Sequence, residues 1–277
     1  MEESSGLRVL RCILPYFENV YARYNRREFV SPDPLETIYP FLRIEDREVA
    51  ALLVSCIAYG RVAMILRNAR RLLGVLGHSP AEYVRNASPS VVERETSFFR
   101  HRFTTGSEIA SLICGMGSIL REYGTLEELF AYSMGKNKNF LEGVSIFVEK
   151  IRKRSPAGNS FLLPSPRDGS ACKRLFLFLK WMVRRDDVDP GGWKAAHPRD
   201  LLLPMDVHMF RICSSLGFTD RKHPDLRASV EVTGLFRMLL PEDPTKYDFV
   251  LTRFGIRKDL SENSFLEFCQ EKTNTKK

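Results

Sequence analysis

The chain has 277 residues, of which 44% are hydrophobic and 19 are phenylalanine. This length and composition can bury a core as one large domain or as two small lobes, which excludes a disordered or low-complexity protein. The formal net charge is +8, and basic globular proteins tend to bind polyanions such as DNA, RNA or an acidic membrane surface.

Hydrophobic residues recur at helical spacing through almost the whole chain. We expect helices over residues 7–23, 46–59, 62–76, 108–122, 126–133, 140–153, 173–185, 207–216, 225–239, 245–254 and 261–270. Ser79 and Ser107 are expected to be helix N-caps. No run alternates with period two for long enough to predict a strand. The pattern predicts an all-α fold with two loop-rich segments, 155–172 and 186–206, and function concentrates in loops on a rigid scaffold.

The sequence lacks the motifs that define several functional classes. It contains no GxxxxGK[ST], HExxH or GxSxG motif, which speaks against the enzymes that these motifs define. The six cysteines form no CxxC pair and the five histidines are scattered, so we expect reduced thiols, no metal and no cofactor. The acidic start is unlike a signal peptide, and the longest apolar run, 49–59, is too short for a bilayer. We therefore expect a cytoplasmic protein without membrane contact.

One segment is far more basic than the rest of the chain. Residues 149–185, which we call the basic segment, hold ten basic side chains and only two acidic ones, Glu149 and Asp168. Their net charge of +8 equals that of the whole chain. A cluster this dense favours a surface that faces phosphates over a random solvated face.

Two short stretches carry the main functional hypothesis. In FLLPSPRDGSACKRLFLFLK, a proline and a Gly/Ser-containing turn precede Lys173 and an apolar helix. In LLLPMDVHMFRICSSLG, Pro204 precedes Asp206, which opens another helix. The pair resembles the helix-hairpin-helix superfamily of DNA glycosylases. There, a Leu-Pro-Gly-x-Gly-x-Lys hairpin is followed downstream by Pro-Val-Asp-x-His-Val.

The match is close at residues 204–211 and looser at the hairpin, where residues 166–172 replace the compact Gly-x-Gly turn. Lys173 and Asp206 are 33 residues apart; this long gap and the tail at 247–255 resemble the archaeal 8-oxoguanine glycosylase branch. Most of residues 20–258 also resembles a family of bacterial hypothetical proteins without an assigned function. That second resemblance supports the fold more than the activity.

The glycosylase resemblance implies a single all-α unit over residues 1–277 with two helical lobes around a cleft. The lobes would be about 1–60 with 207–277, and 61–206. It also implies that Lys173 is the nucleophile, while the Asp206 carboxylate stabilises the oxocarbenium-like state as the C1′–N bond breaks.

The nucleophile must be a neutral amine, which the positive end of the helix dipole and the neighbouring Arg174 would favour at Lys173. Lys180 lies on the same helical face and is the reserve nucleophile.

Further residues are expected to contact DNA, which would be a duplex with a damaged base flipped out. Expected nucleic-acid-binding residues are Gly169, Ser170, Arg167, Arg174, Arg184, Arg185, His208 and Arg211. Expected residues of the base pocket are Tyr59, Arg61, Phe178, Trp181 and Asp248. We expect a monomer in the bacterial cytosol or nucleoid.

Ordinary structural roles compete with these assignments. Asp206 before an apolar helix is also a common N-cap, and Lys173 is one of ten basic residues in its segment. The leading hypothesis is a DNA glycosylase, with or without lyase activity, acting for example on an oxidised purine. The alternative is a non-catalytic DNA-binding protein that retains the fold, and an RNA-directed protein is the third. The deciding observation is whether Lys173 and Asp206 face one pocket.

Overall fold

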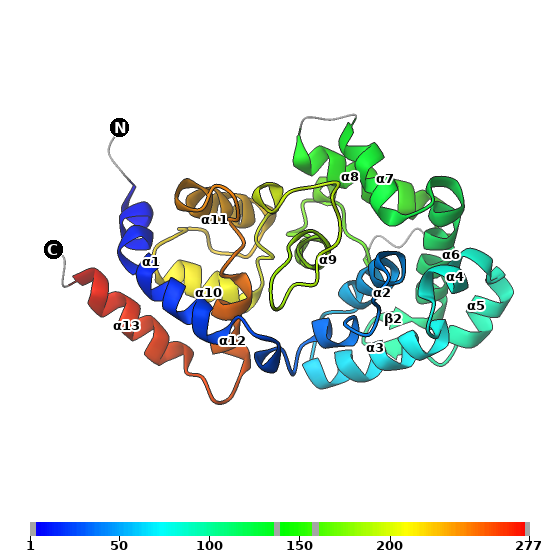
Figure 1. The fold of residues 1–277 in the computed structure, drawn as a ribbon, viewed down its shortest axis with the longest axis horizontal. Coiled ribbons are helices and arrows are strands. Elements are labelled where there is room, and N and C mark those ends of the chain that lie inside the picture. Colours follow the sequence, from blue (N-terminus) through cyan, green and yellow to red (C-terminus); the bar gives the residue numbers. More distant parts are fainter. Residues whose placement is uncertain (1–3, 136–138, 157–160, 275–277) are drawn as a thin grey trace. The chain divides into compact units, whose positions relative to one another are not determined.

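A computed structural model of the chain describes residues 4–135, 139–156 and 161–274. In this part the chain forms thirteen α-helices, four short 3-10 helices and one two-stranded hairpin (Figure 1). The prediction of an all-α fold is therefore confirmed at that level. The chain divides into two compact units. Residues 1–29 with 197–277 are the terminal unit, and residues 30–196 are the central unit.

The terminal unit packs around its first helix. Its elements are α1 (Ser5–Tyr24), η1 (Arg27–Phe29), η4 (Pro198–Asp200), α10 (Val207–Ser215), α11 (Leu226–Leu239), α12 (Asp248–Ile256) and α13 (Glu262–Asn274). Figure 1 shows α1 and α13, from opposite ends of the chain, side by side. Phe17 of α1 is fully buried and its ring contacts those of Phe236, Tyr247 and Phe265. This aromatic core joins α1 to α11, α12 and α13.

The central unit is built on two largely buried helices, α2 and α6. Its elements are η2 (Pro34–Thr37), α2 (Ile44–Cys56), α3 (Val62–Leu76), α4 (Pro80–Asn86), α5 (Pro89–Thr96), β1 (Arg100–His101), β2 (Thr104–Thr105), α6 (Gly106–Tyr123), α7 (Leu126–Gly135), α8 (Phe140–Arg154), η3 (Pro166–Asp168) and α9 (Lys173–Val183). Helix α2 packs on α4 and α9, while α6 packs on α4, α5 and α8. Because neighbours surround α2, its sequence is apolar on nearly every side.

Two buried carboxylates of α2 bind the N-termini of neighbouring helices. The Asp46 carboxylate accepts a hydrogen bond from the Ala81 amide of α4 at 2.9 Å. Glu48 accepts from the first two amides of α7, at 2.6 and 3.1 Å, and from the Trp193 indole at 2.9 Å. The first-turn amides of a helix lack intrahelical partners, and here the side chains of a different helix accept their hydrogen bonds. Burial raises the pKa of Glu48 to about 8.

Some predicted boundaries differ from those of the structure. Ser79 is the N-cap residue of α4, as the sequence predicted, although its side chain makes no capping hydrogen bond. The sequence predicted neither the extent of α4 nor the short helix α5 and the hairpin, because seven-, eight- and two-residue elements leave little periodicity. The N-cap of α6 is Thr105 rather than Ser107, since Thr105 and Glu108 form a capping box. Helix α9 ends at Val183, two residues earlier than expected.

The two units also divide the chain elsewhere than at the expected lobe boundaries. The expected boundaries lay near residues 60 and 206, whereas the units divide after Phe29 and after Ala196. Helix α2 consequently belongs to the central unit. Among the described residues, no helix combines the length and apolar character needed to cross a membrane.

Candidate functional site

A tight turn with two left-handed residues precedes Lys173. The η3 turn is capped by Ser165, whose own N–H donates to the Asp168 carboxylate at 2.9 Å. Gly169 then has φ of 70° and Cys172 has φ of 49°. Helix α9 begins directly after Cys172, so Lys173 is its first residue, as the sequence predicted.

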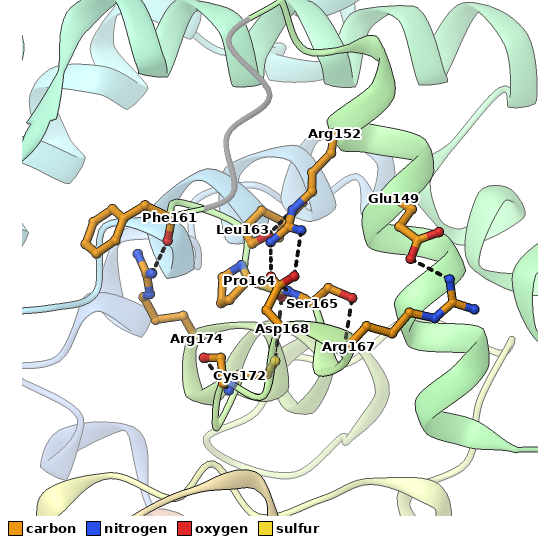
Figure 2. Close-up of polar contacts among 11 residues, drawn as sticks. Glu149, Arg152, Phe161, Leu163, Pro164, Ser165, Arg167, Asp168, Cys172 and Arg174 are labelled. Carbon is orange, nitrogen blue, oxygen red and sulfur yellow. Dashed lines mark hydrogen bonds and ion pairs between the residues drawn. The ribbon is translucent and has the colours of Figure 1, made fainter.

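This turn is tied to α8 (Figure 2). Arg152 of α8 donates to the Leu163 carbonyl at 2.8 Å and pairs with Asp168 at 2.5 Å. Arg167 reaches from the turn to Glu149 of α8 at 2.6 Å (Figure 2). It also pairs with Glu142 of α8. The expected phosphate contact of Arg167 would therefore compete with two carboxylates.

Two small residues of the turn, Gly169 and Ser170, were also expected to contact phosphates. Gly169 is exposed, and Ser170 is half-buried. The Ser170 hydroxyl accepts from the Cys172 amide at 3.3 Å. Burial raises the pKa of the Cys172 thiol to about 12, so this cysteine remains protonated at neutral pH.

Arg174 is largely enclosed by the central unit. Its guanidinium donates to the carbonyl oxygen of Phe161 (Figure 2). It also donates to the carbonyl oxygen of Cys56. It also lies over the rings of Tyr59 and Phe161, at 5.2 and 5.0 Å from their centroids. Burial lowers the pKa of Arg174. In this structure Arg174 joins α9 to the end of α2 and to the loop at Phe161, rather than presenting its charge to a phosphate.

The end of α9 carries a buried ionic cluster. Lys180 and Arg184 are 2% and 3% exposed, and Asp189 is fully buried. The Asp189 carboxylate lies 2.9 Å from Arg184 and 3.5 Å from Lys180, and Arg184 also pairs with Asp186. Burial raises the pKa of Asp189 against the opposing effect of the two cations. The expected phosphate contact of Arg184 is thus corrected, because its charge is used inside the unit. Arg185 is exposed.

Two aromatic residues expected in a base pocket lie in the core instead. Phe178 is 0% exposed and Trp181 is 1% exposed. The Phe178 ring stacks on Phe147 at 6.3 Å and meets Trp193 edge-on at 5.2 Å. Side chains surrounded by protein offer no face to a base, so this expectation is corrected. They occupy the apolar face on which α9 packs.

Tyr59 anchors the β1–β2 hairpin. Its hydroxyl donates to the His101 carbonyl at 2.7 Å and lies 2.7 Å from the Thr104 hydroxyl. The His101 ring in turn contacts the Tyr59 carbonyl through Nε2 at 2.7 Å. Tyr59 therefore positions the hairpin, a role that the sequence did not indicate. Arg61 is exposed and is the N-cap residue of α3.

In the terminal unit, Asp206 begins α10. One carboxylate oxygen accepts hydrogen bonds from two amides of the first turn, at 2.9 and 2.8 Å, so Asp206 is an N-cap. The segment before it is tethered to α11. The Leu203 amide donates to the Thr233 hydroxyl at 3.0 Å, and the Ser229 hydroxyl donates to the Leu203 carbonyl at 2.6 Å. These bonds hold the backbone three residues before Asp206, and the capping bonds orient its carboxylate.

His208 and Arg211 of α10 converge on Glu262 at the start of α13. Arg211 pairs with Glu262, which raises the pKa of Arg211, and His208 Nδ1 lies 3.9 Å from the Glu262 carboxylate. Gly255 of α12 makes room for both, since a Cβ there would lie 2.3 Å from His208 and 2.6 Å from Glu262. Asp248 is 5% exposed and lies inside the unit, which does not favour its expected place in a base pocket.

Lys173 lies in the central unit and Asp206 in the terminal unit. Each opens a helix of its own unit, as the sequence predicted. Their convergence on one pocket stays a prediction.

A group of exposed residues at the hairpin was not predicted from the sequence. Arg100 and Arg102 are exposed, and Phe103, in the turn between the strands, is 74% exposed. The Phe103 ring meets that of Phe161, which is 47% exposed, at 6.4 Å. The available signal was the run FFRHRF at residues 98–103, since interleaved aromatic and basic residues are typical of nucleic-acid-binding surfaces.

The chain belongs to a protein family of unknown function, DUF2400, whose family model matches residues 33–257. All the candidate site residues from Tyr59 to Asp248 fall inside this range. Comparison with curated proteins and with solved structures found no match. Membership defines the family without adding an activity.

Proposed function

We propose that the protein is a DNA glycosylase that removes a damaged base with Lys173 and Asp206. The observation that supports this most is the backbone around both residues. Lys173 is the first residue of α9 after a left-handed turn, and Asp206 caps α10 after a tethered segment. In the glycosylases that these two stretches resemble, a lysine and an aspartate at these places serve as nucleophile and stabilising carboxylate.

In the proposed reaction, the Lys173 amine forms a bond to C1′ as the C1′–N glycosidic bond breaks. The base leaves with the bonding electron pair and takes up a proton from solvent, while the amine releases a proton. The sugar ring then opens to give a protonated imine between C1′ and the lysine. The Asp206 carboxylate stabilises the positive charge that develops on the sugar.

Borohydride trapping tests this proposal, because it reduces the imine to a stable protein–DNA adduct. We expect an adduct with oligonucleotides that carry an oxidised purine or an abasic site, and none with Lys173→Gln. Lys153→Gln, which changes an exposed lysine of α8, is the matched control and should trap normally. Undiminished trapping by Lys173→Gln would exclude Lys173 as the nucleophile.

Asp206→Asn separates the second residue from the first. The amide oxygen can still accept the capping hydrogen bonds, so the variant should fold and bind. We expect it to lose most base removal, because a neutral amide cannot match a carboxylate in stabilising positive charge. Trapping on a pre-formed abasic site should persist, since no base has to leave. Normal base removal would contradict the role given to Asp206.

A non-catalytic DNA-binding protein is the second candidate, and the turn before Lys173 favours it. The Ser165–Asp168 capping box and the Arg152–Asp168 pair close this turn on itself, where the glycosylases present a Gly-x-Gly hairpin. Tight DNA binding without an adduct on oxidised, alkylated, deaminated or abasic substrates would favour this candidate.

A further inference from the structure

We propose that Phe103 and Phe161, with the exposed arginines beside them, form a stacking platform for an unpaired base of a DNA strand. We call this group the aromatic tip; it consists of Arg61, Arg100, Arg102, Phe103 and Phe161. The inference rests on the proposed DNA-directed function. It adds the form of DNA bound there, which is a strand with unpaired bases rather than an intact duplex.

The first support is the exposure of the two rings. Phe103 and Phe161 are 74% and 47% exposed, although large aromatic side chains of both units form buried cores. Their centroids are 6.4 Å apart and the rings are nearly perpendicular, at 89°. Each ring therefore keeps accessible surface while it supports the other. Exposed apolar groups in contact mark surfaces that bind a ligand more often than isolated ones do.

The second support is the rigid base beneath Phe103. The strands pair Arg100 with Thr105 and His101 with Thr104. His101 is 3% exposed and its ring lies between the Tyr59 carbonyl, at 2.7 Å, and the Asn68 amide, at 2.9 Å. A ring presented on a fixed backbone loses little conformational entropy on binding.

The third support is the backbone of Arg102. Its φ of 54° is left-handed, and hairpin turns favour glycine or asparagine in that conformation. Gly60 faces this residue, and a Cβ on Gly60 would lie 3.2 Å from the Arg102 side chain. Such conformations cost stability and concentrate at binding sites. Arginine in place of glycine keeps a cation 5.7 Å from the Phe103 ring centroid.

The fourth support is charge. Arg61, Arg100 and Arg102 are exposed, and within the described residues none of them pairs with a carboxylate. Unpaired arginines can contact phosphates, while the adjacent rings can stack on a base. A nucleotide unit of a DNA strand offers a phosphate and a base together, and Arg102 places a cation 5.7 Å from the Phe103 ring centroid. We therefore prefer DNA to an apolar peptide or a lipid surface.

The strand must have unpaired bases because of the geometry of stacking. In an intact duplex both faces of each base are covered by its neighbours, so a phenylalanine ring reaches a base face only where a base is unstacked.

Fluorescence anisotropy with a labelled oligothymidine and with a duplex of the same length tests the platform. Phe103→Ala should weaken binding of the single strand by about 5- to 150-fold, because stacking contributes about that factor per base. Duplex binding should change much less. Met238→Ala is the matched control, since Met238 is also exposed, at 65%, but lies in the terminal unit. It should bind both oligonucleotides like the unchanged protein.

Two further variants separate stacking from simple apolar contact. Phe103→Trp retains a stacking face and should retain affinity, whereas Phe103→Leu retains bulk without such a face and should lose most of it. Phe103→Trp also gives a direct spectroscopic readout. The chain's own tryptophans, Trp181 and Trp193, are 1% and 4% exposed, so quenching by oligothymidine would report on the new indole.

The outcomes distinguish this inference from the proposed function. Equal affinity of Phe103→Ala and the unchanged protein for oligothymidine would overturn the platform, even if borohydride trapping succeeds. Full affinity in Phe103→Leu would overturn it as well, in favour of an apolar contact such as a peptide or a vesicle surface. Binding that depends on Phe103 without any adduct would support the platform and count against the glycosylase. No binding of any DNA would overturn both.

Discussion

The basic segment contains ten cationic side chains and the aromatic tip contains three. The region with more cations is nevertheless the one whose arginines are more often paired with carboxylates. Most arginines of the basic segment are neutralised, several by carboxylates outside it; the pairs are Arg152–Asp168, Arg154–Glu122, Arg167–Glu142, Arg167–Glu149, Arg184–Asp186 and Arg184–Asp189. The three arginines of the tip are exposed and have no carboxylate partner in the described part of the chain. Density of charge along a sequence is therefore a poor guide to charge that can reach a phosphate.

The largest effect should come from Arg184→Ala, and it should fall on stability. The substitution leaves the fully buried Asp189 with one cation fewer, and breaking a buried ion pair costs about 3–5 kcal/mol. Urea unfolding measures the loss. The control is Arg185→Ala, which changes the next, exposed residue and should alter the free energy of unfolding little. Weaker DNA binding at unchanged stability in Arg184→Ala would show instead that the Arg184 charge reaches a phosphate.

The next largest effect should come from Glu48, a fully buried ionisable side chain of α2. Glu48→Ala removes the acceptor of two α7 amides and of the Trp193 indole. A buried donor left without a partner costs about 1–3 kcal/mol, so we expect a loss of at least that size in urea unfolding. No loss would mean that α7 does not depend on this cap.

The same residue predicts a pH dependence. Burial raises the pKa of Glu48 from 4.5 to about 8, so the folded protein holds this proton more tightly than the unfolded chain. Its contribution to stability is therefore present below about pH 4.5 and is lost as the pH rises towards about 8. Urea unfolding across this range should show a negative slope that Glu48→Gln reduces. An unchanged slope in Glu48→Gln would contradict the assignment.

A smaller effect should separate the two regions in DNA binding. Arg102→Gln should lower the slope of log affinity against log salt by about 0.7 for a single strand, the value for one lost phosphate contact. Arg167→Gln removes the same charge from the basic segment, but two glutamates already pair with it. Its slope should stay close to that of the unchanged protein. An equal decrease in the salt slope of both variants would contradict the distinction between the aromatic tip and the basic segment.

The smallest effect should be that of Arg167→Gln on stability. The side chain is 48% exposed and its pairs with α8 lie at the surface, where water and salt screen them. We expect no measurable change in Tm by circular dichroism. A clear decrease in Tm would show that the pairs with α8 hold the turn before Lys173. Arg167 would then stabilise the fold, as Arg184 is expected to do.

Local features of the sequence determined where the candidate helices begin. Asp206 was recognisable as a helix start because an acidic N-cap before an apolar run satisfies first-turn amides within three residues. Lys173 was recognisable because a proline and glycine turn precedes a helical pattern. The burial of α2 also followed from its own residues, since a helix that is apolar on every side has to be covered.

Outside a helix that is apolar on every side, only the tertiary structure decided which side chains are exposed and which charges have no partner. Phe178 and Phe103 are the same residue type, yet one lies in the core and the other at a hairpin tip. Arg154 is neutralised by Glu122 of α6, which lies 32 positions earlier in the chain, whereas Arg102 has no such neighbour within the described residues. Burial and ion pairing depend on what packs against a side chain from elsewhere in the chain, and periodicity and capping report only on residues a few positions apart.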